Sequence, residues 1–392
     1  MEMPVPQRDV AIVLAGGHVN GAFTATGFLK RLRESSLWPR VGTIFATSSG
    51  GLVGTFAALD RLDDLEKFLL GLQPSDIFRP RPLFAVLFRG PQEFVLPATV
   101  VKRVGPLEHL AEELSIASRE LVVIVTDIGG AAQESRQIQR FPLRQFEVAY
   151  SSRTTSPQVM ANAIFASAAI PGYVEPIVVD GVIGVDGGWV RNYPLAHAFE
   201  RLEVSTIVSC SHRSGVSTPK GDGFVASALK PALPFLKPFR YVPGIGTLVG
   251  ELEQALERRQ RGFPVDLTDV LLRLGSITIT RNMAFEDVLA DEKDRSVDAL
   301  FALEHDVRTM ARASGGDGNL DSAIAARFLA ADFAFRHDRK LERFEVCVTP
   351  PRGIDLDPGP RRLRPWRMEE KRALIARGYA LTDQALRTRG IR

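Results

Sequence analysis

Residues 41–59 read VGTIFATSSGGLVGTFAAL, and this stretch decides the fold class. It opens with an apolar run at 41–46, passes through five small residues, and continues with apolar residues at helical spacing. Apolar runs of that length are typical of buried strands, and small residues allow a sharp turn into a helix. The turn carries Ser48, which therefore follows the carboxyl end of a strand, where open parallel sheets bind their ligands.

The same order of strand, turn and helix is repeated along the chain. Residues 10–14 form an apolar run that ends at two glycines, and helical spacing follows from Ala22. Further apolar runs occupy 121–125 and 204–210. Buried strands that alternate with helices predict a three-layer α/β/α sandwich around a mainly parallel central sheet. The residues that follow these strands are expected to meet at one crevice: Gly16 and Gly17, Ser48, Asp127, and His212.

Composition places the chain among ordinary globular proteins. Of 392 residues, 45% are hydrophobic and 24% are charged, and only Cys210 and Cys347 could form a disulfide, which excludes collagen-like, disordered and disulfide-stapled chains. A net charge of +3 is too small to predict a nucleic-acid partner. No apolar segment reaches the ~18 residues of a membrane-spanning helix, and the start lacks the features of a secretory signal. We therefore expect a cytoplasmic protein whose contact with membranes is peripheral.

The length corresponds to two or three domains of ordinary size. We expect a catalytic core at 1–215, an inserted, lid-like segment at 216–275, and a helical, basic segment at 276–392 that completes or flanks the core. From Arg361 to Arg392 there are ten Lys and Arg against three Asp and Glu, a local charge of +7. Such a basic end either binds anionic lipid head groups or belongs to a solvated terminal helix whose cations lie near the C-terminus of that helix.

Two segments rich in proline and phenylalanine interrupt the pattern, at 78–101 and 231–250. Proline at this density prevents long helices, and so much aromatic surface is costly in water. These segments either cover the core or cap the crevice as a lid that meets lipid. The side chains of interest are Phe84 and Phe88 in the first segment, and Phe235 and Phe239 in the second.

The residues from Ala46 to Gly50 stand where a nucleophile elbow would, and its general pattern is G-x-S-x-G. The sharp turn lifts a serine hydroxyl above the strand, and small neighbours let the helix pack beneath it. The backbone N–H of Ser49 then points toward the oxyanion that develops on an attacked carbonyl. A simple turn or helix cap is the alternative interpretation of Ser48.

A glycine-rich loop at 16–21, GGHVNG, opens the first helix and presents N–H groups to an anion. A dinucleotide site would need an acidic residue at the end of the second strand, where this chain has Phe45 and Ala46 leading into Ser48. A P-loop would need Gly-Lys-Ser/Thr, which does not follow. The loop is therefore a candidate for binding an oxyanion or a phosphate.

Asp186 follows an apolar run and precedes two glycines. It suits a general base that activates a serine, or a plain turn residue. Together, the loop, Ser48 and Asp186 resemble the patatin-like phospholipases, serine acyl hydrolases with a Ser–Asp dyad and the motifs G-G-G-x-[KR]-G, G-x-S-x-G and D-G-[GA]. The resemblance covers about residues 8–215. It rests on these segments: 15–23, AGGHVNGAF; 46–51, ATSSGG; 166–172, ASAAIPG; 185–195, VDGGWVRNYPL; and Thr126-Asp127 after a strand.

The resemblance implies a role for each matched residue. Ser48 would be the nucleophile, and Asp186 the base that takes its proton and later activates water. The oxyanion hole would be formed by the backbone of four residues: Gly16, Gly17, His18 and Ser49.

Two departures from the family pattern affect the loop. His18 replaces the third glycine, and Asn20 replaces the basic residue. Histidine tolerates a positive φ better than most residues, and oxyanion donors in the backbone survive both changes. Without the basic residue, a substrate phosphate loses a long-range attraction. We expect a weaker or differently selective hydrolase, with Asn20, Phe235 and Phe239 as further candidate substrate contacts.

A histidine triad is the competing arrangement, because His197 and His212 lie downstream of Asp186, in the order that α/β-hydrolases use. His197 is expected in a helix with a surface role. His212 is expected at a strand end near the crevice. The resemblance to a Ser–Asp dyad requires neither.

The resemblance thus predicts an acyl hydrolase of phospholipase A type, with a glycerophospholipid or another acyl-ester lipid as substrate. No His, Cys or Asp spacing indicates a metal site, and no cofactor is expected. One alternative is a general esterase or acyltransferase. The other is a non-catalytic protein that binds lipid or a partner on a degenerate scaffold, which Ala46, His18 and Asn20 support and the intact Ser48 and Asp186 oppose.

Overall fold

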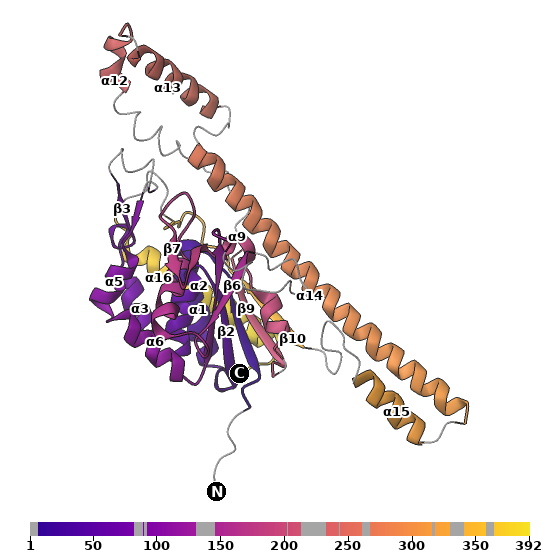
Figure 1. The fold of residues 1–392 in the computed structure, drawn as a ribbon. Coiled ribbons are helices and arrows are strands. Elements are labelled where there is room, and N and C mark those ends of the chain that lie inside the picture. Colours follow the sequence, from indigo (N-terminus) through magenta and orange to yellow (C-terminus); the bar gives the residue numbers. More distant parts are fainter. Residues whose placement is uncertain are drawn as a thin grey trace.

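A mixed sheet with helices on both faces forms the centre of the molecule (Figure 1). The structure is a computed structural model, and the part of the chain that it describes comprises residues 7–81, 89, 92–130, 146–201, 203–212, 233–242, 244–260, 267–315, 318–329, 341–357 and 364–392. Within these ranges, no helix is both long enough and apolar enough to span a bilayer.

Eight strands of the described chain make up the central sheet. Five run parallel, in the order β10 (Glu342–Cys347), β9 (Thr206–Ser211), β1 (Val10–Leu14), β2 (Val41–Thr47) and β5 (Glu120–Asp127). Three complete the sheet in antiparallel pairs: β6 (Glu147–Ser151) and β8 (Val182–Asp186) on β5, and β7 (Ile177–Val179) on β8. The four apolar runs predicted to be strands are all strands.

Strand β1 shows why the sheet needs two helical layers, because all five of its residues are fully buried. Val10, Ile12 and Leu14 face one core, and Ala11 and Val13 face the other. The first core is built with α1 (His18–Arg33), α2 (Ser49–Ala58), α3 (Leu62–Gly71), α6 (Leu107–Ile116), α8 (Pro157–Ala166) and α16 (Met368–Thr388). The second is covered by α10 (Leu195–Phe199) and the middle of α14 (Leu267–Ala313), beside the short helix α9 (Gly188–Arg191). The predicted three-layer α/β/α architecture is confirmed.

Helix α14 crosses this second face and runs past the sheet at both ends (Figure 1). Its 47 residues correspond to a length of about 70 Å at 1.5 Å per residue. Helix α15 (Gly318–Leu329) folds back on its far end, where Arg308 of α14 pairs with Asp321 at 2.8 Å. Two short 3-10 helices join elements of the first face: η1 (Trp38–Arg40) and η2 (Pro74–Asp76).

The first proline-rich segment covers the core in its described part. Its strands β3 (Phe78–Pro80) and β4 (Gln92–Phe94) form a hairpin, followed by α5 (Leu96–Arg103). The buried ring of Phe78 lies 5.8 Å from that of Phe94 and 5.3 Å from that of Tyr173. Phe84 and Phe88 lie outside the described residues.

The second proline-rich segment differs from the first. It contains α12 (Leu233–Leu236), the 3-10 turn η4 (Lys237–Phe239) and the start of α13 (Ile245–Gln260), and these elements stand apart from the sheet in Figure 1. Phe235 is 76% exposed and Phe239 is 55% exposed. The interpretation of this segment as a cover for the core is therefore wrong for these two side chains.

Helix α16 packs so closely on α1 that the two backbones touch at glycines. A Cβ atom on Gly378 would lie 1.9 Å from the Thr24 carbonyl oxygen, and one on Gly27 would lie 1.9 Å from the Ile375 carbonyl oxygen. Leu374 and Leu386 are fully buried on the same helix. The basic C-terminal end is thus built on a helix whose inner face belongs to the core.

We predict that Gly378→Ala lowers the free energy of unfolding by at least about 2 kcal/mol, because the added methyl group forces two packed helices apart. Chemical denaturation monitored by circular dichroism would measure the change. Gly250→Ala in α13 is the matched control, since no atom lies within 4 Å of its added Cβ. The control should be neutral or more stable by up to ~1 kcal/mol, from helix propensity alone. Equal stability of the two variants would contradict the close contact.

Candidate active site

Ser48 occupies a strained turn between β2 and α2. Its backbone has φ 56° and ψ −130°, a conformation that a non-glycine residue keeps only when its surroundings hold it there. Ser167 provides that hold: its Oγ accepts the Ser48 N–H at 2.8 Å and donates to the Ile124 carbonyl of β5 at 2.6 Å. The turn therefore has the strand, strained serine and helix of a nucleophile elbow.

The structure brings together two residues that are 138 positions apart in the chain. Ser48 Oγ donates a hydrogen bond to Asp186 Oδ2 at 2.7 Å, and both side chains are buried. The other carboxylate oxygen, Oδ1, accepts the N–H of Gly188 at 2.7 Å. Asp186 ends β8, and its backbone N–H is bonded to Ala169 at 2.9 Å. Its carboxylate is thus held on both oxygens.

Burial raises the pKa of Asp186 above its ordinary value, because a carboxylate is poorly solvated there. The Gly188 N–H, the Ser48 hydroxyl and the charge of His18 oppose this rise, since each stabilises the carboxylate. A carboxyl group with a raised pKa is a stronger proton acceptor than a solvent-exposed aspartate.

The glycine loop contributes fewer oxyanion donors than the sequence predicts. The N–H of Gly16 is donated to the carbonyl of Asn192 at 3.0 Å, so it does not face the reacting oxygen. Gly16 is required for a different reason, since a Cβ at this position would lie 2.9 Å from Ser48 Cβ and 2.3 Å from Asn192 Oδ1. The prediction of Gly16 as an oxyanion donor is therefore wrong, whereas the residue itself lets the loop approach Ser48.

The remaining candidate donors lie where two helices begin. The N–H of Gly17 makes a long hydrogen bond of 3.4 Å to Ser49 Oγ. His18 and Ser49 are the first residues of α1 and α2, where a helix has no internal acceptor for its N–H groups. His18 has φ 50°, as expected for a residue in the place of a glycine.

His212 lies beneath the glycine loop. A Cβ on Gly17 would meet its Cδ2 at 2.3 Å, and its Nδ1 lies 3.4 Å from Thr24 Oγ1. Burial lowers the pKa of His212 to about 4, with a further contribution from His18, so the ring is neutral at neutral pH. The Ser48 hydroxyl is bonded directly to Asp186, with no imidazole between them.

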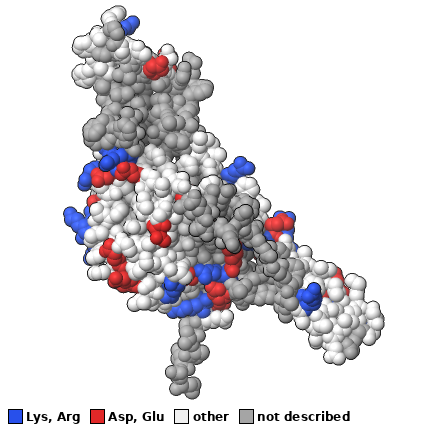
Figure 2. Space-filling model, in the orientation of Figure 1, with Lys and Arg blue, Asp and Glu red and all other residues white. Residues whose placement is uncertain are grey.

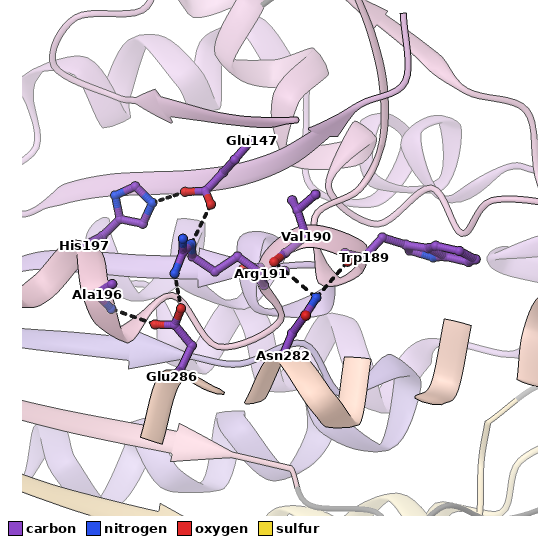
Figure 3. Close-up of polar contacts among 9 residues, drawn as sticks. Glu147, Trp189, Val190, Arg191, Ala196, His197, Asn282 and Glu286 are labelled. Carbon is purple, nitrogen blue, oxygen red and sulfur yellow. Dashed lines mark hydrogen bonds and ion pairs between the residues drawn. The ribbon is translucent and has the colours of Figure 1, made fainter. Parts of the chain in front are cut away.

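His197 is not on the surface, and the prediction of a surface role is wrong. It lies in α10 with 9% of its area exposed, and its Nε2 bonds the carboxylate of Glu147 on β6. Burial alone would raise the pKa of Glu147, but His197 and the guanidinium of Arg191 hold it at about 2. This buried group of charges lies on the face that α14 covers (Figure 3).

Two further residues that the sequence places near the crevice, Asn20 and Asp127, make hydrogen bonds that hold the local structure. The side chain of Asn20 donates to Asp355 Oδ1 at 3.0 Å and accepts the Leu356 N–H at 2.9 Å, so it ties the 355–357 segment to α1. Asp127 Oδ1 accepts the N–H groups of Gly129 and Gly130 at 2.8 and 3.2 Å, which is the geometry of a turn. Among the described residues, no group of three or more His, Cys, Asp or Glu is arranged to hold a metal ion.

Some residues of the site were not predicted as such. Ser167 and Asn192 both lie in segments that resemble the family, but nothing in their spacing assigns them a partner. Asn282, Met283 and Glu286 of α14 also contact the residues that follow Asp186. Their only sequence signal is helical periodicity.

Comparison with protein families gives a match over the part of the chain that contains this site. The model for patatin-like phospholipases matches residues 12–199. This part of the chain belongs to the patatin-like phospholipase family. The patatin-like domain contains the glycine loop, Ser48 and Asp186, and it ends before α14 begins. Membership supports lipid acyl hydrolysis as the general activity.

Comparisons with individual proteins add little to the evidence from the family match. No curated protein matches the chain. Among solved structures, the crystal structure of VipD from Legionella pneumophila is similar, with 14% sequence identity and a TM-score of 0.38, over 98% of this chain and 67% of that one. A likeness this low gives no independent support for the fold or the function.

Proposed function

We propose that this chain is a serine acyl hydrolase that cleaves a carboxylic ester of a glycerophospholipid, with Ser48 as nucleophile and Asp186 as base. The observation that carries the proposal is the 2.7 Å hydrogen bond from the Ser48 hydroxyl to the buried Asp186 carboxylate, at an elbow turn within a patatin-like domain. A serine hydroxyl needs such a base, because it is a weak nucleophile at its own pKa.

In the first step, Ser48 Oγ attacks the ester carbonyl carbon while its proton moves to Asp186 Oδ2. The carbonyl oxygen becomes an oxyanion, which the N–H groups at the start of α1 and α2 stabilise. The tetrahedral intermediate then collapses: the bond from carbon to the alcohol oxygen breaks, and the proton on Asp186 passes to the departing alcohol. Ser48 is left as an acyl ester.

In the second step, water occupies the place of the departed alcohol. The water oxygen attacks the acyl carbon while Asp186 accepts a proton from the water. The bond between the acyl carbon and Ser48 Oγ then breaks, and the proton passes from Asp186 to Ser48 Oγ. A fatty acid leaves, and the free serine is restored. A second alcohol in place of water would make the same site an acyltransferase.

We expect Ser48 to be labelled covalently by a fluorophosphonate probe, and Ser48→Ala to remain unlabelled. Asp186→Asn should lower kcat by about 10²- to 10⁴-fold with little effect on folding, because the side chain keeps its size but cannot accept the proton. Label quantification by mass spectrometry and kcat on a short-chain ester would measure both effects. Asp180→Asn, in the exposed turn before β8, is the matched control and should keep the activity.

Two results would redirect this assignment. If folded wild-type protein neither reacts with the probe nor turns over ester, the chain is a binding protein on a patatin scaffold. If activity survives in Asp186→Asn but is lost in His212→Ala, a histidine is the base.

The raised pKa of Asp186 predicts the acid limb of the pH–rate profile. Asp186 accepts a proton only as the carboxylate, so kcat should fall as pH falls through a midpoint above the ordinary aspartate value of 3.8. The electrostatic interaction with His18 lowers the pKa of that carboxyl group, and His18→Asn should therefore move the midpoint to higher pH. Asparagine also tolerates the positive φ at this position. His109→Asn on the exposed side of α6 is the control, and a midpoint that is equal in all three proteins would count against the role of His18.

A phospholipase must reach lipid in a membrane, and the segment from α12 to η4 offers a surface for this. Besides Phe235 and Phe239, Tyr241 is 86% exposed. Two cations alternate with these rings in the sequence: Lys237, which pairs with Glu253 at 2.9 Å, and Arg240, which lies over the Tyr241 ring. On the face drawn in Figure 2, the described atoms at this end are mostly those of residues other than Lys, Arg, Asp and Glu. Apolar and cationic groups together favour binding at a bilayer interface.

We expect the double variant Phe235→Ser/Phe239→Ser to reduce hydrolysis of vesicle phospholipid by about tenfold or more, since each inserted aromatic side chain contributes roughly 1.5–3 kcal/mol. Hydrolysis of a soluble short-chain ester should be unchanged. The pair Val101→Ser/Ile116→Ser, on exposed positions of α5 and α6, is the control. Equal loss of both activities, or loss of neither, would remove this surface as the lipid contact.

A further inference from the structure

The short helix α9 directly follows Asp186 and touches two sides of the active site. The N–H of Gly188, its first residue, is bonded to Asp186 Oδ1 at 2.7 Å. The carbonyl of Arg191, its last residue, accepts a hydrogen bond of 2.9 Å from Thr47 Oγ1, beside Ser48. Any displacement of α9 therefore moves the base and the residue before the nucleophile.

The residue after α9 reaches the third side of the site. Asn192 accepts the Gly16 N–H at 3.0 Å with its carbonyl, and its Nδ2 donates to the Gly16 carbonyl at 3.1 Å. These two bonds fix the start of the glycine loop. The segment 186–192 thus connects the base, the elbow and the loop.

This segment cannot hold its own shape. Helix α9 has four residues, far fewer than an isolated helix needs, and its last carbonyl groups have no partner inside the helix. Asn282 of α14 supplies the missing donor: its Nδ2 bonds the carbonyl oxygens of Trp189 at 2.8 Å and Val190 at 3.2 Å (Figure 3). Half-buried Asn282 is therefore a cap for α9 that comes from a helix outside the patatin-like domain.

The side chain of Arg191 provides a second attachment. Its guanidinium lies between Glu147 of β6, at 2.5 Å, and Glu286 of α14 (Figure 3), and all three side chains are less than 10% exposed. Glu286 also accepts the N–H of Ala196, at the start of α10, at 2.9 Å. A buried charge that loses one of its partners is strongly destabilised, so this group resists displacement of α14.

Helix α14 is also shaped to receive α9. Gly275 lies against the indole of Trp189, and a Cβ there would stand 2.8 Å from Cζ2. Met283 Sδ lies 3.1 Å from Asn192 Nδ2, so the same helix contacts the residue that fixes the glycine loop. Four residues of α14 thus contact the segment after Asp186: Gly275, Asn282, Met283 and Glu286.

We propose that α14 is a positioning element of the active site: Asn282 and Glu286 hold α9, and α9 with the following Asn192 holds Asp186, Thr47 and Gly16 in register. The proposal rests on the Ser48–Asp186 function proposed above. Neither residue touches the reacting atoms. Both act through α9, and the patatin-like domain at 12–199 therefore depends on a helix that begins at residue 267.

The test uses two substitutions in the full-length chain. Asn282→Asp keeps the size of the side chain and replaces the donor by a carboxylate that repels both carbonyl groups. Glu286→Gln keeps the shape and removes the charge opposite Arg191. Because small misplacements of catalytic groups are costly, we expect each to lower kcat on a soluble ester by about tenfold or more, with KM changed by less than about twofold. The rate of fluorophosphonate labelling at Ser48 should fall in parallel.

Matched controls separate positioning from general stability. Thr280→Asp places the same carboxylate on the exposed side of the same helical turn, and Glu292→Gln makes the same charge change at an exposed position. Both should keep wild-type kcat and labelling rates. Circular dichroism and melting temperatures must show all four variants folded at the assay temperature. If Glu286→Gln does not fold, Asn282→Asp decides the question alone.

The outcomes distinguish the two proposals. If wild-type protein is labelled and active while folded Asn282→Asp and Glu286→Gln match it in kcat and labelling, α14 does not position the site. A loss that appears only in KM, or that equals the loss in the controls, overturns the proposal as well. A folded wild-type protein that is neither labelled nor active would instead overturn the function proposed for Ser48 and Asp186.

Discussion

The hydrogen bond between Ser48 and Asp186 requires two loops from different parts of the chain to meet above β5, the strand that separates β2 from β8 in the sheet. Two residues make this crossing possible. Ser167 links the Ser48 N–H to the Ile124 carbonyl of β5, and Gly187 lies so close to that carbonyl that a Cβ would stand 2.1 Å from it. The sheet order, the strained turn and the glycines after Asp186 all serve this one contact.

A buried site makes each of its charges depend on specific partners. The Asp186 carboxylate accepts hydrogen bonds from the Ser48 hydroxyl and the Gly188 N–H, and burial raises its pKa. Glu147 is buried to a similar degree, yet its pKa is lowered because Arg191 and His197 face it. Two carboxyl groups that are both buried thus differ in pKa according to the charges beside them: the pKa is raised at Asp186 and lowered at Glu147.

Much of the fold could be predicted from local patterns, because a fully buried strand such as β1 or β2 must be apolar along its whole length. Ser48 and Asp186 could also be identified as candidates, since the motifs that contain them require small residues close by. Gly16 shows the limit of such motifs: a glycine needed for close approach looks the same as one that presents its N–H. His197 shows another limit: the residues beside it in the sequence do not reveal its distant partner Glu147, whose carboxylate makes the burial of the histidine favourable.

By itself, the sequence determined the strand–turn–helix units, the nature of the candidate nucleophile and base, and the family of residues 12–199, because each depends on neighbours within a few residues. Only the tertiary structure decided which groups complete the site. Ser167, Asn192 and the α14 residues Asn282 and Glu286 act through hydrogen bonds between segments that are far apart in the chain. A hydrogen bond or ion pair needs its two atoms within about 3 Å, and the sheet order and helix packing that set such distances leave no trace in local periodicity.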